Sequence, residues 1–140
     1  NGSGATRVIG ELYPFGFGLS YTTFAYSDLE VSPLRQRTQG EYTVKVNVTN
    51  TGKRAGDEVV QLYVRDKVSS VITYDSQLRG FERISLKPGE TRQVTFSLKP
   101  EDLQILDRNM NWTVEPGEFE VMIGASSQDI RLKKTITALP

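Results

Sequence analysis

Apolar and polar side chains alternate with a period of two over residues 42–49. Such a period places the apolar side chains on one face of a half-buried β-strand. The alternation returns in three later segments, 60–64, 94–98 and 119–123. The pattern therefore predicts four strands that each turn one face to a core. The first two, separated by a short turn, are predicted to be adjacent antiparallel strands.

Turn-forming residues separate these strands, and a further strand is expected at about residues 130–137. Clusters of Gly, Pro, Asn, Asp and Ser lie at residues 50–57, 87–90, 115–118 and 125–128. Residues 100–103 predict a single helical turn, because proline starts it and carboxylates follow in its first turn. About seven short strands with almost no helical period predict an all-β fold, an antiparallel immunoglobulin or fibronectin type III-like β-sandwich.

The first 22 residues depart from this pattern, since residues 11–21 are aromatic and glycine-rich without a period of two. They predict a non-regular segment whose aromatic side chains are buried against the sandwich or a neighbouring domain. We therefore expect a linker and docking segment at 1–22 and a fibronectin type III-like domain at 23–140. The side chains predicted to dock are Tyr13, Phe15, Phe17, Leu19 and Tyr21.

Composition narrows the chemistry open to the chain. It has neither cysteine nor histidine, which excludes disulfides, thiolate nucleophiles, imidazole bases and the usual zinc ligands, so any catalysis would rest on carboxylates, Lys or Tyr. The 17 basic and 17 acidic residues balance, so no basic surface for nucleic acid is expected. No apolar run is long enough to span a membrane. We predict neither a cofactor nor a metal. We interpret the start, Asn-Gly-Ser-Gly, as the edge of a piece from a longer protein.

Residues 12–24, Leu-Tyr-Pro-Phe-Gly-Phe-Gly-Leu-Ser-Tyr-Thr-Thr-Phe, closely resemble the junction before the C-terminal domain of family-three glycoside hydrolases, the β-glucosidases and β-xylosidases. Further matching stretches follow in the expected order, at residues 46–52, 56–64, 78–83, 86–90, 115–119 and 123–127. The resemblance implies a fibronectin type III-like domain downstream of a catalytic barrel and an α/β sandwich domain.

Members of this family use a retaining mechanism, in which one carboxylate attacks the anomeric carbon and another carboxyl group protonates the leaving oxygen. The family takes both groups from upstream of this domain, so the resemblance implies no catalytic residue in this chain. It also implies that the partners are the upstream catalytic domains and that the protein is periplasmic or secreted. The choice between glucosides and xylosides stays open.

Some residues suggest chemistry independently of the resemblance. Glu118 and Glu120 share one face of a strand, as two carboxylates of a retaining pair would, but solvated surface positions are the simpler interpretation. Asp57, Glu58 and Asp66 lack the spacing of a calcium loop. Trp112 is the candidate sugar contact, with Tyr63 and Tyr74 as further members of an aromatic platform; packing in a core or interface is the alternative for all three.

Three functional hypotheses follow. The first is a non-catalytic structural and interdomain module of a retaining β-glycosidase, docked through Tyr13 to Tyr21. The second is a carbohydrate-binding module that holds an oligosaccharide through Trp112. The third is an autonomous adhesion or scaffold domain with no glycosidase upstream, since fibronectin-like sandwiches serve many functions.

Overall fold

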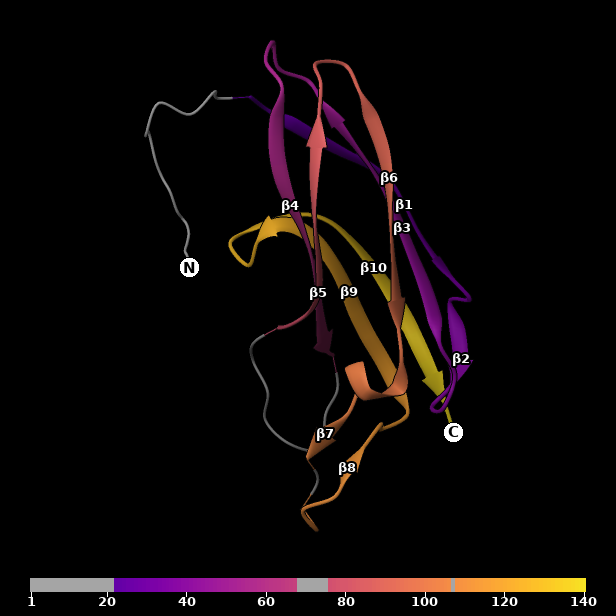
Figure 1. Ribbon diagram of the computed structural model, residues 1–140. Helices are drawn as coiled ribbons and strands as arrows, with labels where there is room; N and C mark the ends of the chain where they lie inside the picture. The colour runs from indigo at the N-terminus through magenta and orange to yellow at the C-terminus, as the bar shows by residue number, and fades with distance from the viewer. Residues whose placement is uncertain (1–21, 68–75, 107) are drawn as a thin grey trace.

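A computed structural model of the protein describes residues 22–67, 76–106 and 108–140 (Figure 1). The described elements, in chain order, are β1 (Phe24–Ser32), β2 (Arg35–Arg37), β3 (Tyr42–Asn50), β4 (Gly56–Asp66), β5 (Gln77–Leu86), β6 (Thr91–Leu98), the 3-10 turn η1 (Pro100–Asp102), β7 (Ile105–Leu106), β8 (Trp112–Thr113), β9 (Gly117–Ser126) and β10 (Asp129–Leu139).

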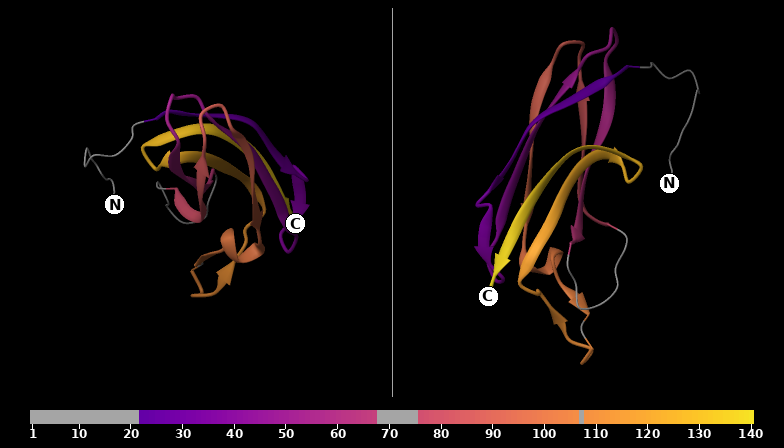
Figure 2. Two further views of the ribbon diagram at one scale, coloured as in Figure 1. Left: turned by 45° about the horizontal axis from the view of Figure 1, so that its top comes forward. Right: turned by 180° about the vertical axis from the view of Figure 1, so that it is seen from behind.

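The strands form two facing sheets (Figures 1 and 2). One sheet has the order β1-β3-β6, and the other has the order β2-β10-β9-β4-β5. All neighbours are antiparallel except the short β2, which pairs parallel to β10. Strands β7 and β8 form a separate two-stranded hairpin. Leaving out β2 and this hairpin, seven long strands make the sandwich, as the sequence predicts.

Side chains from both sheets interdigitate to form one core. Strand β3 contributes Tyr42 and the valines at 44, 46 and 48, while β4 contributes Val60, Leu62 and Val64. Other fully buried members come from the remaining strands of the two sheets: Leu86, Val94, Leu98, Val121, Ile123 and Ile136. The alternation in the sequence thus identifies the inward faces of β3, β4, β6 and β9 correctly.

The expectation that 42–49 and 60–64 are adjacent strands is wrong. Strand β3 pairs with β1 and β6, whereas β4 pairs with β5 and β9. The turn between them therefore carries the chain from one sheet to the other, and their apolar faces meet across the core. A period of two records which face is buried, but it holds no information on the hydrogen-bonded neighbour.

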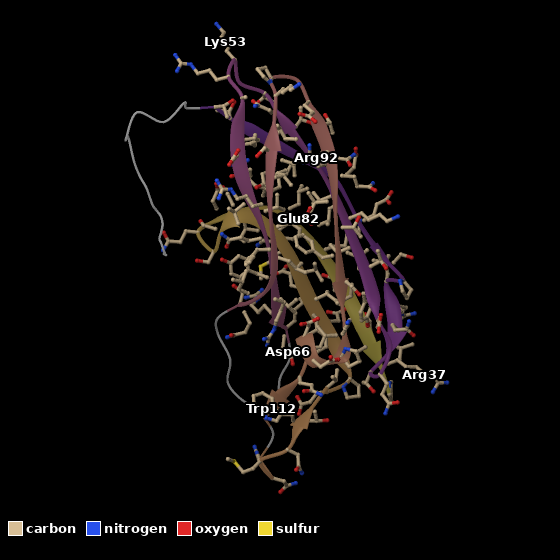
Figure 3. All side chains as sticks on the ribbon, viewed as in Figure 1. Arg37, Lys53, Asp66, Glu82, Arg92 and Trp112 are labelled. Atoms are coloured by element: carbon tan, nitrogen blue, oxygen red, sulfur yellow. The ribbon has the colours of Figure 1, made fainter. Side chains whose placement is uncertain are left out.

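The predicted helical turn is present as η1. The backbone N–H of Lys99 donates to the Asp102 carboxylate at 2.8 Å, which satisfies a donor at the start of the turn. The β7–β8 hairpin follows and projects from one end of the sandwich, the end opposite Lys53 in the β3–β4 turn (Figure 3).

Candidate functional site

Asn50, at the end of β3, is the one polar side chain classed as fully buried among the described residues, with 0% of its surface exposed. Its amide makes four hydrogen bonds. Oδ1 accepts from the Thr22 hydroxyl at 2.6 Å and from the Gly52 N–H at 2.9 Å. Nδ2 donates to the carbonyls of Arg54 at 2.8 Å and Leu86 at 3.0 Å. Every donor and acceptor of the amide is satisfied, so its burial is not penalised.

These contacts fix the point where the N-terminal segment joins the sandwich. Besides the Thr22–Asn50 bond, the Thr51 N–H donates to the Thr23 carbonyl at 2.8 Å, and the two hydroxyls of Thr23 and Thr51 lie 2.7 Å apart. The hydroxyl oxygen of Thr22 lies 2.0 Å from where a Cβ on residue 52 would be. Glycine at this position leaves room for that hydroxyl. The five predicted docking side chains, Tyr13 to Tyr21, lie outside the described residues.

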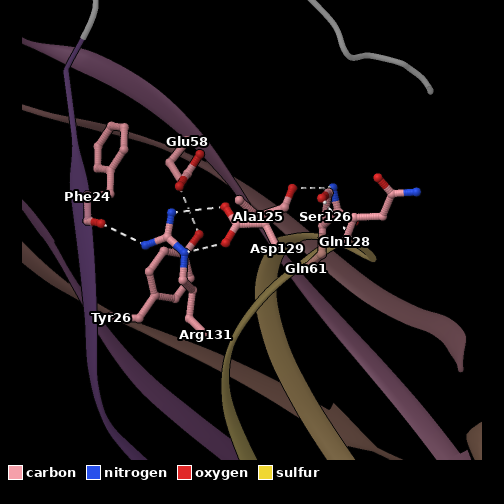
Figure 4. Close-up of polar contacts among 9 residues, drawn as sticks. All are labelled: Phe24, Tyr26, Glu58, Gln61, Ala125, Ser126, Gln128, Asp129 and Arg131. Carbon is pink, nitrogen blue, oxygen red and sulfur yellow. Dashed lines mark hydrogen bonds and ion pairs between the residues drawn. The ribbon is translucent and has the colours of Figure 1, made fainter.

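A second polar cluster joins β1, β4 and β10 at one edge of the sandwich (Figure 4). Tyr26 donates its hydroxyl to Glu58 at 2.9 Å, and the Arg131 guanidinium lies 5.0 Å from the centre of the Tyr26 ring. Arg131 donates to both carboxylate oxygens of Asp129, at 2.7 and 3.0 Å, and to the Phe24 carbonyl at 2.9 Å. Since β1 and β10 belong to different sheets, the cluster ties the two sheets together.

Burial changes the protonation behaviour of this cluster. It raises the pKa of Tyr26, and the nearby Glu58 carboxylate raises it further. Burial also raises the pKa of Glu58, although the hydrogen bond from Tyr26 and the charge of Arg131 oppose the rise. Each carboxylate accepts a hydrogen bond from a neighbouring side chain, Glu58 from Tyr26 and Asp129 from Arg131. We interpret this cluster of Tyr26, Glu58, Asp129 and Arg131, which we call the clasp, as a structural link between the two sheets and not as an acid/base pair.

The raised pKa of Glu58 predicts a pH-dependent difference between the protein and a Glu58→Gln variant. The folded state holds the Glu58 proton more tightly than the unfolded state, so this group lowers stability as pH rises from the unfolded value, near 4.5, through the folded value. Glutamine keeps the acceptor for Tyr26 and does not ionise. The melting temperature of Glu58→Gln, relative to the wild type, should therefore rise between pH 4 and pH 7 in thermal unfolding followed by circular dichroism.

Glu30→Gln, on the exposed surface of β1, serves as the control for removing one carboxylate. Asp57 works in the opposite direction, because its pKa is lowered by hydrogen bonds from Ser85 and Arg83, but it is present in both proteins and cancels in the comparison. A gap between wild type and Glu58→Gln that is constant across this range would contradict the prediction.

The other carboxylates singled out in the sequence are held by ion pairs or by the fold. Glu120 meets Arg65 at 3.0 Å and Glu118 meets Lys67 at 3.6 Å, both on the outer face of the sheet. Asp57 lies on that outer face as well, bound by Arg83 and Ser85, whereas Glu58 points inward to Tyr26. Glu118 and Glu120 thus share a face as expected, and each forms an ion pair with its own basic side chain. Asp57 and Glu58 point to opposite faces of the sheet.

Two of the three members of the proposed aromatic platform, Trp112 and Tyr63, lie among the described residues. Trp112 on β8 is 66% exposed at the end of the molecule opposite Lys53 (Figure 3). Tyr63 is buried on the outer face of β4, where its hydroxyl donates to Gln61. Tyr74 lies outside the described residues. Of the three, only Trp112 is seen to offer an open ring face.

Within residues 22–67, 76–106 and 108–140, no group of three or more His, Cys, Asp or Glu side chains has the arrangement of a metal site. No helix in the same ranges has the length and apolar character needed to cross a membrane.

Comparison with known proteins assigns the sandwich to a family. The family description "Fibronectin type III-like domain" matches residues 58–127, half of the chain. The chain belongs to this fibronectin type III-like family. The matched span runs from β4 to the β9–β10 turn and includes the strands of the larger sheet that pair with β4.

Relatives of this fibronectin type III-like domain are named as glycosidases. It is 52% identical over 122 residues to a β-xylosidase of Formosa agariphila and 46% identical over 122 residues to a periplasmic β-glucosidase of Salmonella typhimurium. A solved β-glucosidase of Erythrobacter marinus is 42% identical, with a TM-score of 0.81 over 91% of this chain.

The domain is a small part of each of these proteins. The matches cover 87% of this chain for the first two relatives, but they span only 17%, 16% and 17% of the β-xylosidase, the periplasmic β-glucosidase and the Erythrobacter marinus β-glucosidase. The fibronectin type III-like fold and the resemblance to β-glucosidases and β-xylosidases, both predicted from the sequence, are confirmed.

Proposed function

We propose that this domain is a non-catalytic structural and interdomain module at the C-terminal side of a retaining β-glycosidase. The supporting observation is the identity of 46–52% to about one sixth of the length of a β-xylosidase and a β-glucosidase. The two polar clusters of the described residues support the same proposal, because their carboxylates and amide are used to hold the sandwich together. The parent protein would supply both catalytic carboxyl groups from upstream. The domain would occupy 23–140, with 1–22 as the linker and docking segment.

The first test is the size and activity of the natural polypeptide. An antibody raised against the purified chain should detect a band several-fold larger than 15.7 kDa in source cells. The protein in that band should hydrolyse p-nitrophenyl β-glucoside or β-xyloside, and the 140-residue chain alone should not. A natural polypeptide near 15.7 kDa, with no larger precursor, would instead support an autonomous adhesion or scaffold domain.

Carbohydrate binding is a second candidate function, favoured by the exposed ring of Trp112. An aromatic face open to solvent is suited to stacking on the apolar face of a sugar ring. This candidate predicts that the parent polypeptide, with its catalytic nucleophile inactivated, binds cello- or xylo-oligosaccharides less well after Trp112→Ala. Met110→Ala, which removes the neighbouring exposed apolar side chain, is the control. Isothermal titration with equal affinity for wild type and Trp112→Ala would eliminate the candidate.

The named relatives also support a compartment. One of them is a periplasmic β-glucosidase, so we propose a periplasmic or secreted location for the parent protein. Fractionation of source cells, with the same antibody, tests this proposal.

A further inference from the structure

The outer face of strands β4 and β5 carries a row of exposed apolar side chains, which we call the β4–β5 stripe: Val59, Leu78 and Phe81. We propose that this stripe is the surface that packs against the folded domain preceding this one on the same polypeptide. The inference rests on the proposed function and goes further, because it names the face that makes the contact.

The strand register places all three residues on one surface. Val60 and Leu62 point into the core, so Val59 must point outward. Phe81 lies opposite Gln61 and Leu78 lies opposite Tyr63, both on that same outward face of β4. The side chains are 39%, 50% and 62% exposed for Val59, Leu78 and Phe81, respectively.

The stripe adjoins a covered apolar surface. Tyr63, opposite Leu78, and Met122, opposite Tyr63 on β9, are both buried although they belong to the outer face. The apolar area therefore continues from the sheet edge at β5 toward its centre at β9. The exposed part of this area is the β4–β5 stripe, and exposed apolar side chains gathered on one surface commonly mark a contact with another protein.

The other sheet provides the contrast. The outward positions of β3 and β6 form four polar pairs: Thr43 with Ser97, Lys45 with Thr95, Asn47 with Gln93 and Thr49 with Thr91. These positions alternate with the buried valines of β3 and with Val94 and Leu98 of β6. The two faces of one sandwich thus differ in character, and the paired positions of β3 and β6 are suited to water whereas the β4–β5 stripe is not.

Charged side chains that are held in place by hydrogen bonds border the stripe. Arg83, beside Val59, donates to Asp57 at 2.6 and 3.1 Å, and Ser85 donates to the same carboxylate at 2.7 Å. These bonds hold the pKa of Asp57 below its usual range, so the carboxylate stays ionised. An apolar centre with an ordered polar rim is the usual composition of a specific protein interface.

The position of the N-terminal attachment indicates which partner covers the stripe. Thr22 packs against Gly56, the first residue of β4. The Cγ2 methyl of Thr22 lies 2.5 Å from where a Cβ on residue 56 would be. Val59 is three residues further along β4, or about 10 Å at the usual rise of a strand. The chain thus enters the domain near the stripe, and a domain on the same polypeptide meets the stripe at a higher effective concentration than a separate protein would. The named relatives have over four fifths of their length outside the matched region, enough for such a domain.

Cysteine footprinting in the full-length polypeptide tests the proposal, since this chain has no cysteine of its own. Val59→Cys and Phe81→Cys are compared with Thr95→Cys on the polar face, and alkylation is measured at each site by peptide mass spectrometry, native against unfolded. We expect protection at 59 and 81 to exceed that at 95 by at least about tenfold, because a closed interface excludes water. Phe81→Ser should also lower the melting temperature of the polypeptide more than Thr95→Ser does.

The outcomes separate this proposal from the proposed function. Equal alkylation at 59, 81 and 95, in a large polypeptide that hydrolyses β-glycosides, would overturn the docking face and leave the interdomain function intact. Protection that disappears on dilution would assign the stripe to a second copy of the protein. A natural polypeptide no larger than this chain would overturn both.

Discussion

Replacing Asn50 with alanine is expected to lower the free energy of unfolding by about 3 to 5 kcal/mol, because four polar groups lose their partner in or near the core. The carbonyls of Leu86 and Arg54, the Gly52 N–H and the Thr22 hydroxyl would each be left without this bond. The loss would be felt in both sheets, since Leu86 ends β5 of the larger sheet and Asn50 ends β3 of the smaller one. Urea unfolding of the isolated chain, followed by Trp112 fluorescence and circular dichroism, measures the change.

Two further variants make the result specific to the amide. Asn50→Asp keeps the size but turns the donor into a charged acceptor facing two carbonyls, so it should be at least as destabilising as alanine. Asn47→Ala removes an amide that donates to the exposed carboxylate of Asp28 at 3.0 Å, and should cost about 1 kcal/mol or less. A loss below that for Asn50→Ala would show that water replaces the amide without penalty.

The sequence carries a signal for the burial of Asn50 besides its place in the turn cluster at residues 50–57. The buried positions of β3 are 42, 44, 46 and 48, and the next position in that register is 50. A polar residue in a core register must find internal hydrogen-bond partners. The register therefore predicts that Asn50 is buried and bonded, while its partners, 28 and 36 residues away in Thr22 and Leu86, required the three-dimensional fold.

The sequence predicted the class of the fold better than its connections. Alternation identified the inward faces of β3, β4, β6 and β9, and proline with two carboxylates identified η1. It assigned β4 to the wrong neighbour, because the choice between pairing with β3 and crossing to the other sheet depends on contacts distant in the chain. Strand β9, more than fifty residues from β4 in sequence, takes that place.

The clasp could not have been predicted for the same reason. Its members come from three strands, and none belongs to a motif with a fixed spacing. In the sequence, Glu58 stands out only with Asp57 and Asp66, as one of three carboxylates that lack the spacing of a calcium loop. Only the approach of β1 to β10 at an open edge of the two sheets makes their charges and hydrogen bonds depend on one another.

Gly124→Ala should be the most damaging of the small-to-large changes considered, with an expected loss of about 2 to 3 kcal/mol. A Cβ at this position would lie 2.1 Å from the carbonyl oxygen of Asp129 and 2.8 Å from the Cα of Ile130. Both atoms are backbone, and β9 is held on its other side by Gln61 of β4, so neither strand can move away freely. The added methyl group would push out the start of β10, which carries Asp129 and Arg131 of the clasp.

Gly80→Ala is the matched control, because its Cβ would meet a side-chain atom, Cδ1 of half-buried Phe96, at 3.2 Å. An aromatic ring can shift by a few tenths of an ångström, and alanine restricts the unfolded chain, so this variant should stay within about 1 kcal/mol of the wild type. The effect of alanine on the entropy of the unfolded chain is common to both variants. The difference between their stability losses therefore reports the backbone clash at residue 124. Thermal unfolding that shows equal losses for Gly124→Ala and Gly80→Ala would mean that β10 can shift as easily as the Phe96 ring. The close approach of β9 to β10 would then not be what positions Arg131 against Phe24.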